Sequence, residues 1–507
     1  MNYIDLGQAD DLENKKDRTL YRFFEILPGF LSCATLILAV VFSFIKPVWV
    51  AIFIILFDLY WTLKVAYLAF NQVTSFRKMQ RTIKTNWRAE LDTLGADWQG
   101  VYHLVFLPFV KEGWDIVSES LEALKNADYP TNQFIVILAP EGRVSEHAHN
   151  IAKLAQEHYG STFGHFLVSI HPSDLPNEII GKGSNVAYAS LKAKELLKEK
   201  NIPLNKVIIS SFDIDTKIFP QYFLCVTYHY LTEHDPHRTS FQPIPVYHNN
   251  IWEASAFTRV VATSNSFWQM MQQERPEQLV TYSSHSMPAI AFFDVGYPKN
   301  IVADDSRIFW KLFFQYNGNY RVTPLYYPLS MDVVTADSFW RTISNQYKQQ
   351  RRWAWGCIEI PYIMFNFWKN KKISWRQKIF SSIVALEGFW AWACASVLIL
   401  ILGWLPVFLG GEGFNVTILS HNLPRLTSAI MIFAMMGMMV SAFLGILFLP
   451  PRPKNIGRFK IFFFVAQWVF LPVTLLIFGS FPALDAQIRL MLGKYLGFWA
   501  TPKIRKH

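Results

Sequence analysis

Long apolar runs with few charged residues stand near the two ends of the chain, on either side of a stretch of mixed polarity. Two runs, about 24–45 and 48–70, lie near the N-terminus, and three, about 383–408, 426–449 and 459–479, lie near the C-terminus. Each is long enough for a helix to cross about 30 Å of hydrocarbon. The first is too long for the core of a cleaved signal peptide, so we expect it to be retained. The pattern predicts an N-terminal hairpin of membrane helices and a C-terminal membrane bundle.

Between these runs, residues 72–375 form short mixed segments separated by turns. Stretches of strand length lie at 102–109, 134–138, 166–170 and 207–212, and helical patterns lie at 114–125, 147–158 and 187–200. This alternation predicts an α/β fold with a mainly parallel sheet. We therefore expect a cytosolic N-terminal segment (1–22), a transmembrane hairpin (23–71), a soluble domain ending in interfacial helices (72–375), a C-terminal transmembrane bundle (376–480) and an amphipathic basic tail (481–507).

The basic residues collect at the edges of the apolar runs. The net charge of +10 alone is compatible with nucleic-acid binding, but no nucleic-acid recognition motif accompanies it. Four basic residues lie between 15 and 22, before the first run, and five lie between 77 and 88, after the second. Cytosolic flanks of membrane helices carry this excess. We expect a multi-pass protein of the plasma (inner) membrane, with a cytosolic domain, membrane lipids as partners and no nucleic-acid partner.

The number of membrane crossings stays open between five and six. A basic loop at 452–460 belongs in the cytosol, and counting one more span then places the C-terminus outside. The tail nevertheless carries Arg489, Lys494, Lys503, Arg505 and Lys506, which is typical of a cytosolic segment. Either the last region is a re-entrant hairpin broken at Pro472 or Pro482, or the charge bias is misleading.

An acidic pair follows the strand-like run 207–212. Asp213 and Asp215 stand one residue apart at its C-terminal end, which is the edge where open α/β sheets bind ligands. Two carboxylates at this spacing can share a hard cation such as Mg²⁺ or Mn²⁺, which in turn binds phosphate oxygens. A turn or a helix cap is the alternative interpretation.

A second acidic pair, Asp304 and Asp305, precedes an apolar helical pattern. Acids at this position can simply cap the helix, where negative charge is favoured. The functional interpretation makes Asp305 a general base.

The stretch 346–356 contains Gln349, Arg352 and Trp353 in a Gln-x-x-Arg-Trp pattern. A basic, aromatic interfacial helix has a similar composition. The pattern follows both acidic pairs in the chain, however, and that order makes a chance origin improbable.

In these three motifs and their order, the chain resembles the membrane-embedded, cellulose-synthase-like glycosyltransferases of family 2. The resemblance covers about residues 100–360 and extends to the layout of spans on both sides of the domain. It implies that Asp213 and Asp215 bind the diphosphate and a Mg²⁺ or Mn²⁺ ion and that Asp305 is the base of an inverting transfer. It also implies that the acceptor and diphosphate end of the site is lined by Gln349, Arg352 and Trp353.

Further residues match the family less closely. The resemblance implies that Glu112 lies beside the nucleotide and Lys182 near phosphate, although either segment could be a turn. Glu141 stands where the family has an aspartate pair that contacts the nucleotide, and Asp304 replaces a usual glutamate. His285 is expected to be structural rather than catalytic. Glu387, inside an apolar run, is expected to face a glycan path, pair with a neighbouring helix or lie at a helix end.

The expected function is that of a nucleotide-sugar-dependent glycosyltransferase, a hexosyltransferase of polysaccharide synthesis, with a nucleotide-diphosphate sugar as donor and a growing glycan as acceptor. One alternative is transfer of a single sugar to a polyprenyl-phosphate or other lipid-linked acceptor. A second is a non-catalytic membrane scaffold or transporter that retains the domain.

Overall fold

The computed structural model describes residues 3–142, 146–173, 175–454, 456–457 and 459–501. Within them, one sheet contains eight strands in the order β3-β2-β1-β4-β7-β6-β8-β5. The strands are β1 (Tyr102–Phe109), β2 (Phe134–Pro140), β3 (His165–Val168), β4 (Val207–Ser211), β5 (Lys217–Ile218), β6 (Thr239–Tyr247), β7 (His285–Pro288) and β8 (Arg321–Met331).

The first half of this sheet is parallel, and the second half is mixed. β1 pairs in parallel with β2 and β4, and β2 with β3. β7 is antiparallel to both β4 and β6, β6 and β8 are parallel, and β5 is antiparallel to β8. The expected α/β fold with a mainly parallel sheet is confirmed. The strands β5 to β8 were not expected from the sequence.

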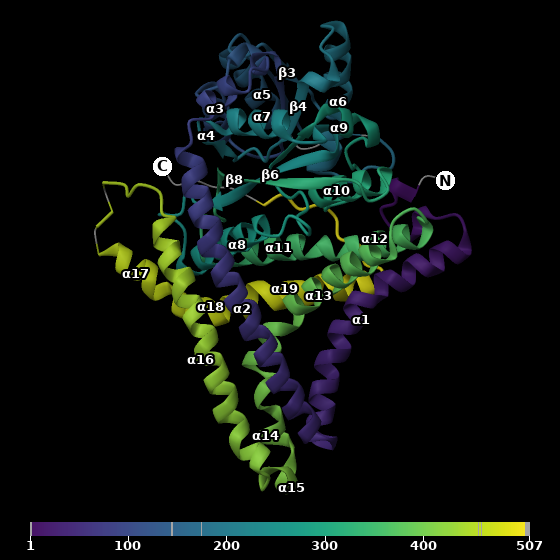
Figure 1. Cartoon of the computed structure of the whole chain (residues 1–507), viewed down its shortest axis with the longest axis vertical. Coiled ribbons are helices and arrows are strands. Elements are labelled where there is room, and N and C mark those ends of the chain that lie inside the picture. The colour runs from purple at the N-terminus through teal and green to yellow at the C-terminus, as the bar shows by residue number, and fades with distance from the viewer. Residues whose placement is uncertain (1–2, 143–145, 174, 455, 458, 502–507) are drawn as a thin grey trace.

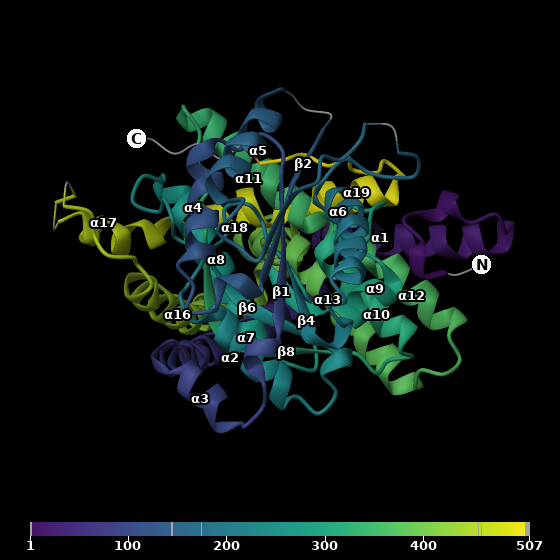
Figure 2. The same ribbon diagram turned by 90° about the horizontal axis from the view of Figure 1, so that it is seen from above.

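Helices cover both faces of the parallel half, so its strands are buried on both sides. Alternate residues of β1 enter opposite cores: Val105 and Leu107 pack on one face, and Leu104 and Phe106 on the other. The first face carries α4 (Trp114–Lys125), α5 (Glu146–Tyr159) and α7 (Tyr222–Thr232). The second carries α6 (Lys182–Glu199), α9 (Ala289–Val295) and α10 (Asp304–Gln315), as Figure 2 shows from above.

Five helical segments of the described chain are long and apolar enough to cross a membrane. They are α1 (Lys15–Ile45), α2 (Pro47–Lys84), α13 (Trp375–Leu400), α16 (Ile418–Leu447) and the segment Lys460–Met491. The expected helical runs are thus confirmed. The expected boundary at residue 72 falls inside α2, because the helix continues through its polar last turns to Lys84.

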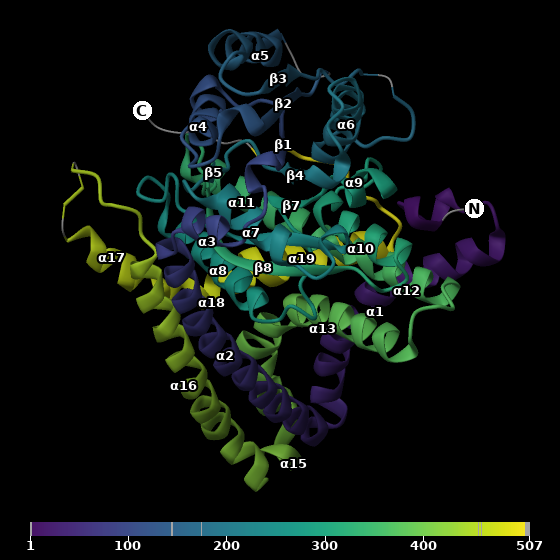
Figure 3. The same cartoon turned by 45° about the horizontal axis from the view of Figure 1, so that its top comes forward.

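Four of these helices, α1, α2, α13 and α16, extend away from the sheet (Figure 1). The fifth segment instead lies across the base of the domain (Figures 1 and 3). It stays helical throughout but changes helix type: α17 (Lys460–Ala466), a 3-10 turn (Gln467–Phe470), α18 (Leu471–Leu475), a π-helix (Leu476–Ser480) and α19 (Phe481–Met491) follow one another. Pro472 and Pro482 lie in the first turns of α18 and α19, and proline lacks the N–H that the interior of an α-helix needs. The helix type therefore changes next to both prolines, and the choice between five and six crossings stays open.

The remaining helices are α3 (Trp87–Thr93), α8 (Ala256–Gln273), α11 (Phe339–Ala354), α12 (Glu359–Lys369), α14 (Leu405–Leu409) and α15 (Gly411–Asn415). α11 and α12 lie between the sheet and the long apolar helices (Figure 1). They expose Trp340 and Trp368, which is typical of helices at a membrane interface.

Glu387 of α13 forms an ion pair with Lys64 of α2 and accepts a hydrogen bond from Tyr60. Of the three interpretations of Glu387, pairing with a neighbouring helix is the one that these contacts support.

Candidate active site

β4 leads directly to the first acidic pair. The main-chain N–H of Asp213 donates to the Ser284 hydroxyl at 3.1 Å, and the Asp213 side chain is about one-third exposed, at 30%. The Asp215 side chain is buried and accepts a hydrogen bond from the main-chain N–H of Asp332 at 3.0 Å. Asp215 is therefore fixed between the ends of β4 and β8, whereas Asp213 reaches into a shared polar cluster.

Lys182 is the centre of this cluster. Its Nζ lies 3.0 Å from Asp213 Oδ1, 2.8 Å from Asp305 Oδ1 and 3.0 Å from the carbonyl oxygen of Ser283. Burial lowers the pKa of Lys182, but the carboxylates of Asp213 and Asp305 outweigh it and leave that pKa raised. Lys182 is thus a charged link between the two acidic motifs.

Close packing of two helix starts allows this link. Lys182 is the first residue of α6, and Asp304 and Asp305 begin α10. A Cβ on Gly183 would lie 2.3 Å from the carbonyl oxygen of Pro298 and 3.0 Å from Asp304 Cβ. Only glycine fits this approach without a shift of the backbone.

Asp305 is held by hydrogen bonds from two hydroxyl groups. The Tyr297 hydroxyl donates to its Oδ1 at 3.2 Å, and the Thr281 hydroxyl donates to its carbonyl oxygen at 2.7 Å. Burial raises the pKa of Asp305, while Lys182 opposes that rise. Burial and the charge of Asp305 raise the pKa of Asp304 more strongly. Both acids stand in the first turn of a helix, so the capping interpretation is compatible with this geometry as well.

Ser283 was not expected from the sequence. It has a φ of 50°, which is rare for a residue with a side chain. Its hydroxyl donates to Asp213 Oδ2 at 2.9 Å, and its carbonyl accepts from Lys182. The nearby His285 is buried and has a pKa lowered to about 3, mainly by burial and then by Lys182. A neutral, buried His285 agrees with the expected structural role. The three serines among residues 283–286 were the available signal for Ser283.

The Gln-x-x-Arg-Trp pattern lies on α11 and reaches the acids indirectly. Trp353 packs against Tyr247 with ring centroids 5.7 Å apart. Burial raises the pKa of Tyr247, and the charges of Asp213 and Asp215 raise it further, so Tyr247 lies close enough to the first acidic pair to feel its charge. Gln349 is buried and accepts a hydrogen bond from Gln346 at 3.2 Å.

Arg352 instead faces the C-terminal segment 492–501. Its guanidinium lies 5.5 Å from the centre of the Phe498 ring. The same ring lies against Gly181, where a Cβ would come within 2.8 Å of it. Residues 492–501 therefore join the start of α6 to α11, which the expectation of a basic tail did not include. The expected basic residues 503, 505 and 506 lie outside the described residues. The aromatic pair Phe498 and Trp499 in an otherwise basic tail was the available signal.

Glu112 and Glu141 follow β1 and β2 at the same edge of the sheet, but each is held by local contacts. The Glu112 carboxylate accepts hydrogen bonds from the N–H groups of Val110 and Lys111 at 2.8 and 2.9 Å. Glu141 is fully buried, with His171 Nδ1 3.7 Å from its Oε1. Their roles beside a nucleotide stay predictions.

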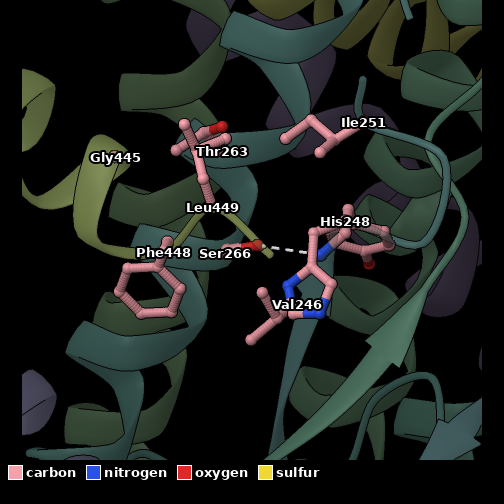
Figure 4. Close-up of a pocket in the computed structure, with 9 residues that line it drawn as sticks. Val246, His248, Ile251, Thr263, Ser266, Gly445, Phe448 and Leu449 are labelled. Carbon is pink, nitrogen blue, oxygen red and sulfur yellow. Dashed lines mark hydrogen bonds between the residues drawn. The ribbon is translucent and has the colours of Figure 1, made fainter. Parts of the chain in front are cut away.

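A small cavity of about 10 Å³ is lined by Tyr247 and by its neighbours Val246 and His248, which Figure 4 labels. This volume admits about one water molecule, so it is too small for a nucleotide sugar. In Figure 4 the Ser266 hydroxyl accepts a hydrogen bond from the main chain of β6, at 3.2 Å from the N–H of Tyr247. The other walls come from α8 and the end of α16: Thr263, Gly445, Phe448 and Leu449. The cavity shows that the end of the apolar helix α16 packs close to α8 and the end of β6.

The donor set fits a hard divalent cation. In the part of the chain that the structure describes, no three His, Cys, Asp or Glu side chains converge on one point. Mg²⁺ needs fewer protein ligands than that, because it keeps several waters and takes one or two carboxylates together with substrate phosphates. The partly exposed carboxylate of Asp213, with Asp215 beside it, is chemically suited to this role.

Comparisons with known proteins give only distant structural likenesses. No known family profile and no curated protein matches the sequence. A mannosyltransferase from Pyrobaculum calidifontis, solved with GDP-mannose and Mn²⁺, is 12% identical with a TM-score of 0.41, covering 84% of this chain and 100% of that chain. TarS of S. aureus, solved as its first 349 residues with UDP, is 12% identical with a TM-score of 0.34, covering 67% of this chain and 90% of that chain. Because these scores lie below 0.5, the functional argument rests on the site itself.

Proposed function

We propose that this protein is a membrane-integrated, inverting glycosyltransferase that transfers a hexose from a nucleotide-diphosphate sugar to a growing glycan on the cytosolic face of the inner membrane. The observation that carries this proposal is the position of Lys182, which lies 3.0 Å from Asp213 and 2.8 Å from Asp305. Residues from three separate segments thus meet at the carboxyl edge of the sheet. Two of them belong to motifs in which the family places the donor and the base.

On the donor side, Lys182 and Arg352 supply positive charge for the diphosphate. Lys182 sits at the N-terminus of α6, where the helix dipole also favours an anion. A Mg²⁺ or Mn²⁺ ion held by Asp213 and Asp215 would neutralise part of the charge of the leaving group. Trp353 is the candidate platform for a sugar ring, and Gln349, one turn before it on α11, is a candidate to line the acceptor and diphosphate end of the site.

On the acceptor side, Asp305 takes a proton. A new bond forms between the acceptor oxygen and the anomeric carbon as the bond from that carbon to the diphosphate oxygen breaks. The electron pair of the broken bond leaves with the nucleotide diphosphate, and the hydroxyl proton passes to the Asp305 carboxylate. The raised pKa of Asp305 makes it a stronger base than an exposed aspartate.

The test is a panel of nucleotide sugars supplied to the purified full-length protein with Mg²⁺ or Mn²⁺. We expect release of nucleoside diphosphate with one donor, formation of a polymer, and loss of both when EDTA removes the metal. A single sugar on a lipid product would replace the polymer interpretation by the lipid-acceptor alternative. Absence of nucleotide release with every donor would favour a non-catalytic scaffold.

A further inference from the structure

A groove of about 540 Å³ opens between α2 and α16, at the end of α16 that is nearest the soluble domain. Its walls are almost entirely apolar and include the strongly exposed side chains of Met439 and Phe443. The lining from α2 is Val73, Phe76 and Arg77, and that from α16 is Met439, Val440, Phe443, Leu444 and Leu447. Arg77 is the only charged residue among these lining side chains.

The two helices are joined tightly just before the groove. A Cβ on Gly437 would lie 2.5 Å from Val65 Cγ1, so the backbones approach closely there. The Ser441 hydroxyl donates to Gln72 Oε1 at 2.9 Å inside this contact. Small residues and buried hydrogen bonds are the usual means of association between helices in lipid. The groove is therefore a fixed feature of the helix pair.

Unpaired positive charge continues from the groove toward the domain. Arg81 and Lys84 follow Arg77 at positions i+4 and i+7, so the three side chains share one face of α2, and all three are exposed. None of the three forms an ion pair within the described part of the chain. Lys78, on another face of the same turn, is by contrast paired with Glu274 at 2.7 Å.

We propose that this groove binds an anionic membrane lipid, with an acyl chain along Phe76 and Phe443 and the phosphate of its head group at Arg77. An apolar wall that ends in an unpaired cation matches the order of acyl chain and phosphate in a lipid. Arg81 and Lys84 add attraction for a head group with net negative charge. A zwitterionic lipid fits the same walls but gains less from these charges, so the site should select by head group.

The experiment is native mass spectrometry of the full chain, delipidated in detergent and mixed with phosphatidylglycerol or phosphatidylcholine of the same acyl chains. We expect the wild type to retain phosphatidylglycerol preferentially. Arg77→Glu should lower its affinity about tenfold or more, because attraction at this position becomes repulsion. Met439→Trp, which fills the groove, should lower the binding of both lipids.

The matched control is Arg376→Glu, at an exposed arginine in the first turn of α13. We expect it to leave lipid retention unchanged, and thermal unfolding should be the same for all variants. Equal retention of the two lipids, or equal effects of Arg77→Glu and Arg376→Glu, would overturn the proposal. Displacement of the bound lipid by soluble glycerol phosphate would also overturn it, because the site would then recognise phosphate alone.

Discussion

Replacing Asp305 by asparagine tests the proposed base with little change of shape. The substitution removes one negative charge and one proton acceptor. The Tyr297 hydroxyl can still donate to the amide oxygen, as it does to Asp305 Oδ1 at 3.2 Å. The main-chain carbonyl of residue 305 keeps its hydrogen bond from Thr281, at 2.7 Å.

The expected effects of Asp305→Asn on the rate and on the free energy of unfolding differ. A positioned general base contributes about 10²–10⁴-fold to rate, so Asp305→Asn should lower kcat by at least about a hundredfold. Lys182 keeps Asp213 at 3.0 Å and the Ser283 carbonyl at 3.0 Å, so no buried charge is left alone. We therefore expect a smaller loss of stability than the about 3–5 kcal/mol that follows when a buried charge loses its partner.

The assay measures release of nucleoside diphosphate alongside thermal unfolding of the same preparation. The matched control is Asp17→Asn, because Asp17 also stands in the first turn of a helix and pairs with one lysine, Lys369, at 2.6 Å. The control should lose an ion pair and keep its activity. An Asp305→Asn protein that unfolds normally and retains more than about a tenth of wild-type kcat would refute the assignment.

Three further predictions concern the packing of the domain and of the C-terminal segment. Gly181→Ala places a methyl group 2.8 Å from the Phe498 ring, at a φ of 154°, so segment 492–501 should detach and limited proteolysis should cut it faster than in the wild type. Burial lowers the pKa of His103 to about 3. In the folded protein this imidazole therefore stays neutral at pH 5, whereas in the unfolded chain, where its pKa is about 6.5, it binds a proton. Lowering the pH from 7 to 5 should therefore lower the free energy of unfolding by about 2 kcal/mol, which thermal unfolding detects as a fall in Tm. In His103→Gln this fall in Tm should be smaller. Arg307→Met leaves Glu359 buried without its ion-pair partner at 2.9 Å and should lower the free energy of unfolding by about 3–5 kcal/mol, measured by denaturation.

The parallel half of the sheet could be predicted because its strands are plain apolar runs between amphipathic helices. The other half could not, because β5 has only two residues and the two longest strands, β6 and β8, each carry two prolines in their interior. β6 reads Thr-Ser-Phe-Gln-Pro-Ile-Pro-Val-Tyr, and β8 carries Pro324 and Pro328. Proline lacks the N–H of a strand ladder, so such runs resemble loops in sequence. The pairing of β6 with β8 accommodates them through a register shift between Gln242 and Ile244, around Pro243.

The membrane region shows a different limit of sequence patterns. Length and hydropathy describe Lys460–Met491 as a span like the others. Its course across the base of the domain depends on partners: α19 packs against α1 and α11. The described end of the chain returns toward the domain that holds the sheet (Figure 1), and the side of the membrane on which the tail lies stays a prediction.

At the site, motif order predicted Asp213 and Asp305 but not the arrangement that joins them. Two helices, α6 and α10, begin within contact of each other, and the N-terminus of each favours negative charge. Lys182 adds a positive charge at the same point, and Asp213 and Asp305 balance it. A diphosphate that enters this point must compete with both carboxylates for Lys182. Binding of the donor should therefore free Asp305 from its lysine, so the loss of that ion pair couples donor binding to a base that is ready to accept a proton.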